Sequence, residues 1–187
     1  MAVSKLDEKP ALIVIDLQKG ITSLPTAHDM GGVVANSAKL AETFRAHELP
    51  VVLVNVTGGA PGRTERALGG GERPKDWAEL VPELNAQPSD IKVTKRTWGA
   101  FYDTELDVEL KDLGVTQVIV CGVATSAGVE STARAAHEHG YNVVLATDAM
   151  TDMNADAHSN SIEHIFPRLG ETGTTQDILA LLEKQAA

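Results

Sequence analysis

The feature that most constrains this chain is an alternation between short apolar runs and longer helical patterns. The runs are rich in Val and Ile and occupy residues 11–15, 51–56, 91–94, 117–121 and 142–146. Because nearly every position in them is apolar, they are typical of strands that are covered on both faces. Strands that alternate with helices form βαβ units. The sequence therefore predicts an α/β fold with three α/β/α layers and a mainly parallel, five- to six-stranded, Rossmann-like sheet.

Helical patterns fill the intervals between these runs. In residues 33–47, apolar positions such as Val34, Leu40 and Phe44 fall on one face, which is typical of an amphipathic crossover helix. Gly, Pro and Thr residues mark limits of the other helices, as caps or breakers. The pattern predicts further helices over residues 104–113, 129–139, 155–166 and 175–184, with Gly114, Gly140 and Pro167 ending the first three and Thr175 beginning the last.

Length and composition are those of one globular domain. The chain has 187 residues, of which 43% are hydrophobic and 22% are charged, which is enough for a complete core. Residues 57–76 differ in kind because Gly, Pro and charged residues dominate them. We expect a long, mobile loop there that is a lid, a binding loop, an oligomer contact or a tolerated surface insertion.

Charge and cysteine content exclude several classes of protein. Lys and Arg number 16 against 26 Asp and Glu, for a net charge of −10, so a nucleic-acid partner is not expected. The single cysteine, Cys121, allows neither an intramolecular disulfide nor a multi-cysteine metal site. No apolar run approaches the roughly 20 residues that span a bilayer, and residues 1–10 lack the apolar core of a signal peptide. We therefore expect a cytoplasmic protein with no membrane partner.

Polar residues follow several of the predicted strands, where open parallel sheets bind their ligands. Asp16 follows the first run, Lys95 the third and Asp148 the fifth. Each alone has an ordinary explanation as a cap or a solvated charge, and for Asp148 a cap on the next helix is the better interpretation. The pair of Asp16 and Lys95 is more informative, because an acid and a base at neighbouring strand ends would shift each other's pKa in a desolvated cleft.

The segment CGVATSAGVESTARAA places a turn of small residues between a predicted strand and a helix. Free backbone N–H groups at a helix N-terminus can hold a developing oxyanion or a substrate carboxylate. Turns that only connect two elements have the same geometry. The segment is therefore weak evidence for a binding site when it is taken alone.

Taken together, these places resemble the isochorismatase-like hydrolase superfamily, which includes isochorismatases, nicotinamidases and N-carbamoyl amidohydrolases. The similar blocks are LIVIDLQKGI, VTKRTWGAFYDTELDVELKDLGVTQVIVCGVATSAGVESTARAA and GYNVVLATDAMTD. They occur in the family's order and at its separations, and they cover almost the whole chain. The resemblance implies a hydrolase in which Asp16 and Lys95 take the places of the family's catalytic aspartate and lysine.

The family's usual cysteine nucleophile falls on Gly128, which has no side chain. The thioester or thiohemiacetal route to amide hydrolysis is therefore absent at that position. We expect Cys121 to be a small buried hydrophobe at the end of its strand. Ser126 and Ser131 are nearby hydroxyls, but the sequence supplies neither with an activating histidine.

Relatives that hydrolyse the vinyl ether of isochorismate also work without that cysteine, and their resemblance implies a mechanism. Protonated Asp16 would act as general acid toward the enolpyruvyl carbon, and water would capture the oxocarbenium-like centre. Lys95 would position Asp16 and the substrate carboxylate. This role requires a raised pKa for Asp16, which burial favours and the charge of Lys95 opposes, and the sequence leaves open which effect is larger.

Positions near the predicted site suggest contacts to a small anionic cyclic substrate. Trp98 and Phe101 closely follow Lys95 and are candidates for an apolar wall, or else for core or interface residues. Gln18, Asn55 and Thr125 lie at strand ends and are candidate polar contacts, and the other candidate contacts are Val123 and Ala124. Because the family commonly has a cis peptide at the matching pair, we expect one between Val123 and Ala124.

No metal and no cofactor is expected. The metal-binding histidine cluster of the nicotinamidase branch has no counterpart in NVTGGAPGRTER, and His137 and His139 are spaced so that they point to different helix faces. The resemblance implies a homo-oligomer, a dimer or larger, in which Trp77 is a candidate interface anchor.

Two alternatives to an isochorismate-like hydrolase stay open. The chain could be a hydrolase or lyase of another small molecule that uses Asp16 and Lys95. It could also be a non-catalytic relative that binds a ligand or partner through the same cleft. The retained acid and base argue against the second alternative, because a dead site has no chemical need for a buried pair of opposite charges.

Overall fold

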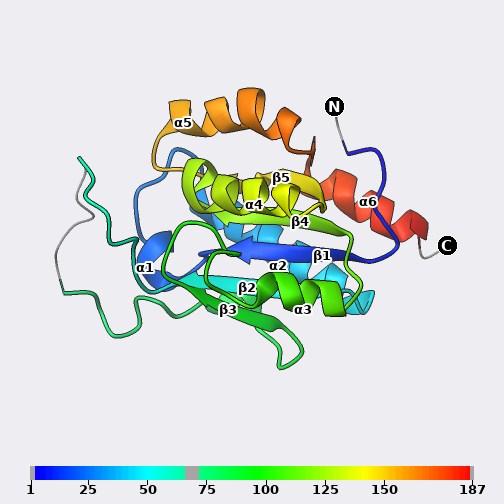
Figure 1. The fold of residues 1–187 in the computed structure, drawn as a ribbon, viewed down its shortest axis with the longest axis horizontal. Helices are drawn as coiled ribbons and strands as arrows, with labels where there is room; N and C mark the ends of the chain where they lie inside the picture. Colours follow the sequence, from blue (N-terminus) through cyan, green and yellow to red (C-terminus); the bar gives the residue numbers. More distant parts are fainter. Residues whose placement is uncertain (1–2, 66–71, 186–187) are drawn as a thin grey trace.

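The central element of the computed structural model, which describes residues 3–65 and 72–185, is a six-stranded parallel sheet (Figure 1). Its strand order is β3-β2-β1-β4-β5-β6, and every neighbouring pair is parallel. The strands are β1 (Pro10–Ile15), β2 (Val51–Val56), β3 (Ile91–Lys95), β4 (Gln117–Val123), β5 (Asn142–Thr151) and β6 (Glu171–Gly173). The α/β fold and all five predicted strands are confirmed, and short β6 completes the sheet at one edge.

Two hydrophobic clusters on opposite faces of the sheet make the three layers. Successive residues of a strand alternate between them: Leu12 and Val14 belong to one cluster, and Ile13 and Ile15 to the other. Helices α2 (Met30–Ala46) and α6 (Thr175–Gln185) cover the first face, and α3 (Leu106–Asp112) and α4 (Glu130–Glu138) cover the second (Figure 1). This two-sided burial explains why the strands read as continuous apolar runs.

Several helix limits differ from those that the sequence predicted. The segment 155–166 is not one helix: α5 (Ala155–Asn160) passes into a π-helical turn, Ser161–Ile165, and a 3₁₀ turn, Phe166–Arg168, that contains Pro167. The turn Thr125–Val129, called here the Gly128 turn, is π-helical and precedes α4. A short helix, α1 (Lys19–Thr22), was not predicted. π-helical and 3₁₀ turns do not follow the 3.6-residue period of an α-helix, so the pattern of apolar residues does not reveal them.

The loop predicted over residues 57–76 lies partly outside the described residues, which exclude 66–71. Its described flanks, 57–65 and 72–76, contain no strand and no α-helix. In the described part of the chain no helix is both long and apolar enough to cross a membrane.

The end of β4 is held unusually close to β1. Gly122 has a φ of 112°, and a Cβ built there would lie 2.1 Å from the carbonyl oxygen of Ile15. Only glycine fits both the conformation and the space. Opposite it, the register of β5 shifts between Leu145 and Met150, so that β5 continues to Thr151 beside the end of β4. These irregularities bring the ends of β1, β4 and β5 together.

Candidate active site

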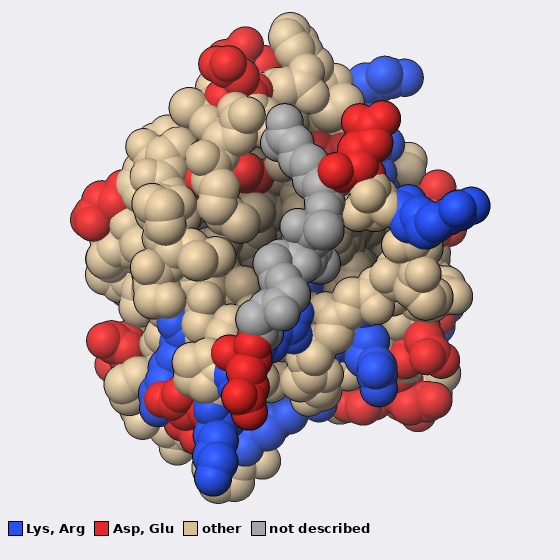
Figure 2. Space-filling model, turned by 90° about the vertical axis from the view of Figure 1, so that its left-hand side faces the viewer, with Lys and Arg blue, Asp and Glu red and all other residues tan. Residues whose placement is uncertain are grey.

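A small pocket lies at the carboxyl edge of the sheet, where the sequence places its candidate residues. Figure 2 looks onto this edge, which is hollowed near its middle. The pocket has a volume of about 150 Å³ and is formed by the ends of β1, β2, β3 and β4 with the Gly128 turn. Asp16, Lys95 and Gly128 all line it, together with Val123, Ala124 and Trp98. The structure therefore brings six of the ten candidate site residues to one cavity.

Asp16 and Lys95 form a buried ion pair in this pocket. Lys95 Nζ donates to Asp16 Oδ2 at 2.7 Å, and their side chains are 1% and 8% exposed, respectively. Lys95 Nζ also donates to the Thr97 carbonyl oxygen at 3.1 Å, so its position is fixed from two sides. Asp16 itself has a φ of 51°, a conformation that places its side chain on the turn directly after β1.

The other carboxylate oxygen of Asp16 has no hydrogen-bond partner. Among residues 3–65 and 72–185, Asp16 Oδ1 is the only buried side-chain nitrogen or oxygen atom without a hydrogen-bond partner. A buried oxygen without a partner costs free energy unless the group is neutral or a ligand supplies the contact. The oxygen therefore marks Asp16 as a group prepared to hold a proton or to meet a bound molecule.

Burial raises the pKa of Asp16 from its ordinary 3.8 to about 6, although the charge and hydrogen bond of Lys95 lower it. The sequence left open whether burial or Lys95 has the larger effect on this pKa. In the structure the effect of burial is larger than that of the lysine. At a pH near 6 both protonation states of Asp16 are present. The residue can then give or take a proton close to neutral pH.

Gly128 faces the acid from the opposite wall. A Cβ built at Gly128 would lie 3.3 Å from Asp16 Oδ2 and 2.9 Å from Ile15 Cγ2, so any side chain there would press on β1. The peptide bond between Val123 and Ala124, which leads into the Gly128 turn, is cis. Among the described residues that line the pocket, none is Cys, Ser or His, and Thr97 has the only hydroxyl group. The described lining of the pocket thus combines a carboxyl group of raised pKa with the absence of any Cys, Ser or His side chain.

The remaining walls are mainly apolar and include two tryptophans. Trp98 lies at the mouth and is 63% exposed. Arg73 reaches the pocket from the other side, with its guanidinium 4.1 Å from the ring centroid of Trp77 and a hydrogen bond from its Nη1 to the Thr57 carbonyl oxygen. Sequence reasoning missed Arg73 as a site residue, and Trp77 was considered only as an interface anchor. Both residues lie far along the chain from the blocks that resemble the family, so no motif spacing pointed to them.

Two of the candidate contacts are structural clamps instead of pocket residues. Gln18 is fully buried: its Oε1 accepts from Val56 N at 2.8 Å, and its Nε2 donates to two carbonyl oxygens. Asn55 donates to the Ala78 carbonyl oxygen at 2.8 Å and accepts from Thr94 Oγ1 at 2.7 Å. Neither side chain lines the pocket. Their position at strand ends was predicted correctly, but their polar atoms are used to tie loops to the sheet.

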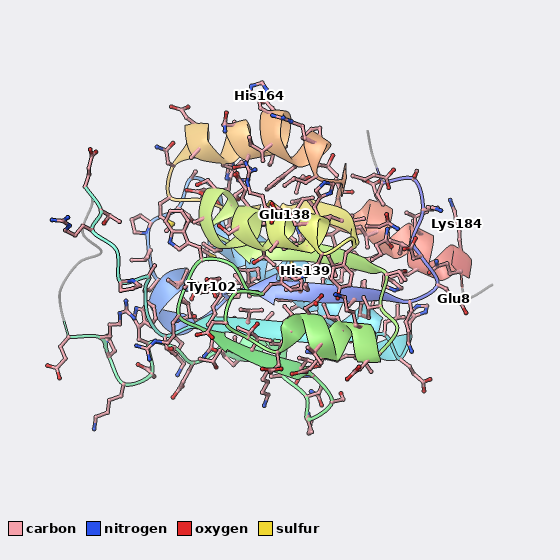
Figure 3. The ribbon with its side chains drawn as sticks, viewed as in Figure 1. Glu8, Tyr102, Glu138, His139, His164 and Lys184 are labelled. Atoms are coloured by element: carbon pink, nitrogen blue, oxygen red, sulfur yellow. The ribbon has the colours of Figure 1, made fainter. Side chains whose placement is uncertain are left out.

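Phe101 and Thr125 are also displaced from the expected role. Phe101 is buried in the core between α3 and α4, next to the rings of Tyr141 and His139, the latter labelled in Figure 3. Thr125 is fully buried and its Oγ1 lies 2.8 Å from His158 Nδ1. Phe101 was predicted from its proximity to Lys95 in the sequence and Thr125 from its position at a strand end, and neither determines which way a side chain points.

The lesser candidates have structural partners as well. Ser126 donates to Asp152, a residue that sequence reasoning did not consider. Asp148 accepts from the backbone and hydroxyl of Thr175 at the start of α6, so it does not cap the helix that follows it. Cys121 is fully buried, and burial raises its thiol pKa to about 12. In the described residues, no three His, Cys, Asp or Glu side chains form a group that would hold a metal ion.

The Isochorismatase domain model matches residues 10–177 of the chain. The chain belongs to the isochorismatase family. The family protein YwoC of Bacillus subtilis (strain 168), which is described as uncharacterized, is 45% identical over 179 residues that cover 92% of this chain and 93% of that protein. The structure of an isochorismatase family protein from Burkholderia thailandensis has 40% identity and a TM-score of 0.93, and the match covers 97% of this chain and all of that one.

A more distant member shows the chemistry of the family. The ureidoacrylate amidohydrolase RutB of Variovorax paradoxus (strain S110) is 30% identical over 200 residues, which cover 90% of this chain and 79% of that protein. The isochorismatase-family chain described here is accordingly a hydrolase, and its pocket is at the expected edge of the sheet.

Proposed function

We propose that this isochorismatase-family hydrolase cleaves a small, anionic, cyclic vinyl ether of the isochorismate type, with Asp16 as the proton donor and no cysteine nucleophile. The observation that carries the proposal is the state of Asp16. Its Oδ1 is buried without a partner and its pKa is raised to about 6. A carboxyl group of this kind is a general acid at near-neutral pH.

The reaction begins with transfer of the Asp16 proton to the methylene carbon of the enolpyruvyl group. A C–H bond forms, the C=C electron pair is consumed, and the ether carbon becomes an oxocarbenium ion that the Asp16 carboxylate stabilises. Water adds to this carbon and returns a proton to Asp16. The resulting hemiketal then breaks its bond to the ring oxygen, which leaves pyruvate and a ring alcohol. Atoms and protons balance, and Asp16 regains its acid form.

The pocket has room for the ring of such a substrate and a positive charge for its carboxylate. About 150 Å³ is also the volume of an engineered cavity that accommodates benzene, so one six-membered ring fits between the walls. Trp77, Trp98 and Met153 supply apolar surface for such a ring. Arg73 provides a guanidinium for a carboxylate, a group that it can bind through two parallel hydrogen bonds. Lys95 holds Asp16 and adds positive charge beside it.

Amide hydrolysis, the activity in the name of RutB, is disfavoured for this chain by its pocket. The space next to Asp16 is bounded by Gly128, so no side chain is present there to attack a carbonyl carbon. A vinyl ether needs a proton and water but no covalent intermediate with the protein. The combination of a raised pKa at Asp16 and an absent side chain at Gly128 therefore supports proton transfer over acyl transfer.

A second candidate is a hydrolase or lyase that uses Asp16 as a base on another small molecule. Its support is that a carboxyl group with a pKa of about 6 is mostly ionised at pH 7. The two candidates differ in the sign of their pH dependence. A general acid loses activity as the pH rises through about 6, whereas a general base gains it.

The test is single-turnover hydrolysis of isochorismate beside a panel of amides and carbamoyl compounds. Wild type is compared with Asp16→Asn, which keeps the shape of the side chain, and with Asp112→Asn, which changes an exposed carboxylate at the end of α3. We expect pyruvate from wild type and Asp112→Asn and none from Asp16→Asn. Equal pyruvate release by Asp16→Asn would rule out the mechanism. Turnover of amides alone would overturn the substrate class, and no turnover of any compound would favour a non-catalytic, ligand-binding relative.

A further inference from the structure

Asp152, at the end of β5, has an unusual set of contacts for a residue outside the pocket. It is 5% exposed, and its Oδ2 accepts from both the backbone N and the Oγ of Ser126, each at 2.8 Å. Its Oδ1 accepts from Asn154 N at 3.0 Å. Its backbone oxygen accepts from Ala27 N at 2.8 Å. One buried carboxylate thus ties β5 to the Gly128 turn and to the start of α5.

A carboxylate is a costly choice for this position. In the described part of the chain no Lys, Arg or His lies within ion-pair distance of Asp152; its charge raises the pKa of His158, but burial and His28 lower that pKa by more. A buried charge without a counter-ion is expensive, while a serine or asparagine could make the local turn to Asn154 at lower cost. A local turn accounts only for Oδ1. The other oxygen, Oδ2, accepts its two hydrogen bonds from Ser126, and this contact is what a second carboxylate oxygen provides.

Ser126 belongs to the Gly128 turn, which packs directly on the acid. Ala124, Ala127 and Gly128 line the same pocket as Asp16. A Cβ at Gly128 would lie 3.3 Å from Asp16 Oδ2, so the turn packs closely against the carboxyl group. The turn is therefore part of what buries Asp16.

We propose that Asp152 is a positioning residue, whose carboxylate clamps the Gly128 turn against Asp16 and so keeps the proton donor buried. Three groups hold this turn, and each holds a different part of it. Asp152 holds Ser126, His158 lies 2.8 Å from the Thr125 hydroxyl, and a helical side chain, Thr132, donates to the Gly128 carbonyl oxygen at 2.7 Å. Only Asp152 contributes a charged acceptor, which makes its bonds to Ser126 the strongest of the set.

The test measures the titration of the Asp16 carboxyl group by ¹³C NMR, with Asp16→Asn used to assign its signal. Three variants separate the clamp from the local turn. Asp152→Ala removes both. Asp152→Ser keeps one oxygen, which can serve the amide of Asn154 two residues on but not Ser126 as well. Ser126→Ala is the matched control, because it removes the hydroxyl and keeps the backbone bond to Asp152.

We expect Asp16 to titrate near pH 6 in wild type and in Ser126→Ala, and closer to its ordinary value of 3.8 in both Asp152 variants. A folded Asp152→Ser protein whose Asp16 titrates as in wild type would overturn the proposal. So would failure of Asp152→Ser to fold, because Asp152 would then be a stabilising residue only. This measurement needs no substrate and does not depend on the proposed function.

A second readout rests on the proposed function. If vinyl ether hydrolysis is the activity, Asp152→Ser should lower kcat by roughly 10²-fold with little change in KM, since misplacement by about 1 Å affects the transition state more than binding. If the Asp152 variants lower the pKa of Asp16 toward its ordinary value but wild type does not hydrolyse the vinyl ether, the clamp is supported and the proposed substrate is rejected. Asp152→Ser could instead lower the pKa of Asp16 toward its ordinary value and keep a wild-type kcat. The clamp would then have no effect on catalysis, which would contradict the role of Asp152 as a positioning residue.

Discussion

Replacement of Asp16 by Asn should shift the difference in unfolding free energy from wild type progressively in favour of the variant as the pH rises. The pKa of Asp16 is about 6 in the folded protein against 3.8 for an ordinary aspartate. Between these values the folded state binds the proton and the unfolded state does not, so the wild type loses stability as the pH increases. Each factor of ten in proton affinity is worth about 1.4 kcal/mol, which gives a total effect of the order of 3 kcal/mol.

The effect is divided over a defined pH range. With the two pKa values above, roughly 1.3 kcal/mol of it falls between pH 5 and pH 7, and most of the rest falls below pH 5. Asparagine has the shape of protonated aspartate and no charge to titrate. The difference in unfolding free energy between Asp16→Asn and wild type should therefore rise by that amount across this range, while the contributions of other groups cancel.

Urea unfolding followed by circular dichroism, at half-unit steps from pH 5 to pH 7, measures this difference. The range brackets the pKa of about 6 that Asp16 has in the folded protein. A difference that stays constant with pH, or that falls, would refute the argument that burial outweighs the lysine. Asp112→Asn, which changes an exposed carboxylate, is measured beside it as the matched control.

Four further outcomes follow from the same site. Lys95→Met removes the charge that lowers the pKa of Asp16, so the carboxyl titration seen by NMR should move above 6, and the alkaline fall in kcat/KM should move with it. Arg73→Gln should raise KM for an anionic substrate roughly tenfold and leave kcat nearly unchanged in steady-state assays. Gly128→Ala should reduce the unfolding free energy by about 1–3 kcal/mol and abolish turnover, because its Cβ presses on the wall beside the acid. Cys121, with a thiol pKa of about 12, should stay unmodified when the folded protein is treated with iodoacetamide at pH 7.5 and examined by mass spectrometry.

The fold was accessible from the sequence because a single physical pattern encodes it. Apolar runs such as 11–15 are buried on both faces of a parallel sheet, and their lengths and separations fix the order of strand and helix. Irregular elements gave no comparable signal. The π-helical Gly128 turn and the shifted register of β5 depend on contacts between segments far apart in the chain, which no local period records.

Prediction of the site was limited in the same way. Strand ends identified Asp16 and Lys95, and the resemblance to the family identified Gly128. The sequence did not reveal which polar side chains face the pocket. Gln18 and Asn55 lie at or just beyond the ends of neighbouring strands and have the right chemistry, yet their polar atoms already bond to Val56 and Thr94 in the sheet and to Trp77 and Ala78 in the nearby loop. Whether a polar side chain already has its hydrogen-bond partners depends on the folded structure and cannot be read from the sequence.

The protonation behaviour of Asp16 is the property furthest from the sequence. Lys95 alone would make this carboxylate a stronger acid than usual, and the opposite result arises because the pocket wall excludes water from it. The Gly128 turn is part of that wall: a Cβ built at residue 128 would lie 3.3 Å from Asp16 Oδ2, so the glycine lets the turn pack against the acid without a side chain between them. A larger side chain at this position would press on Ile15 and on the acid, and the environment that raises the pKa of Asp16 would change with it.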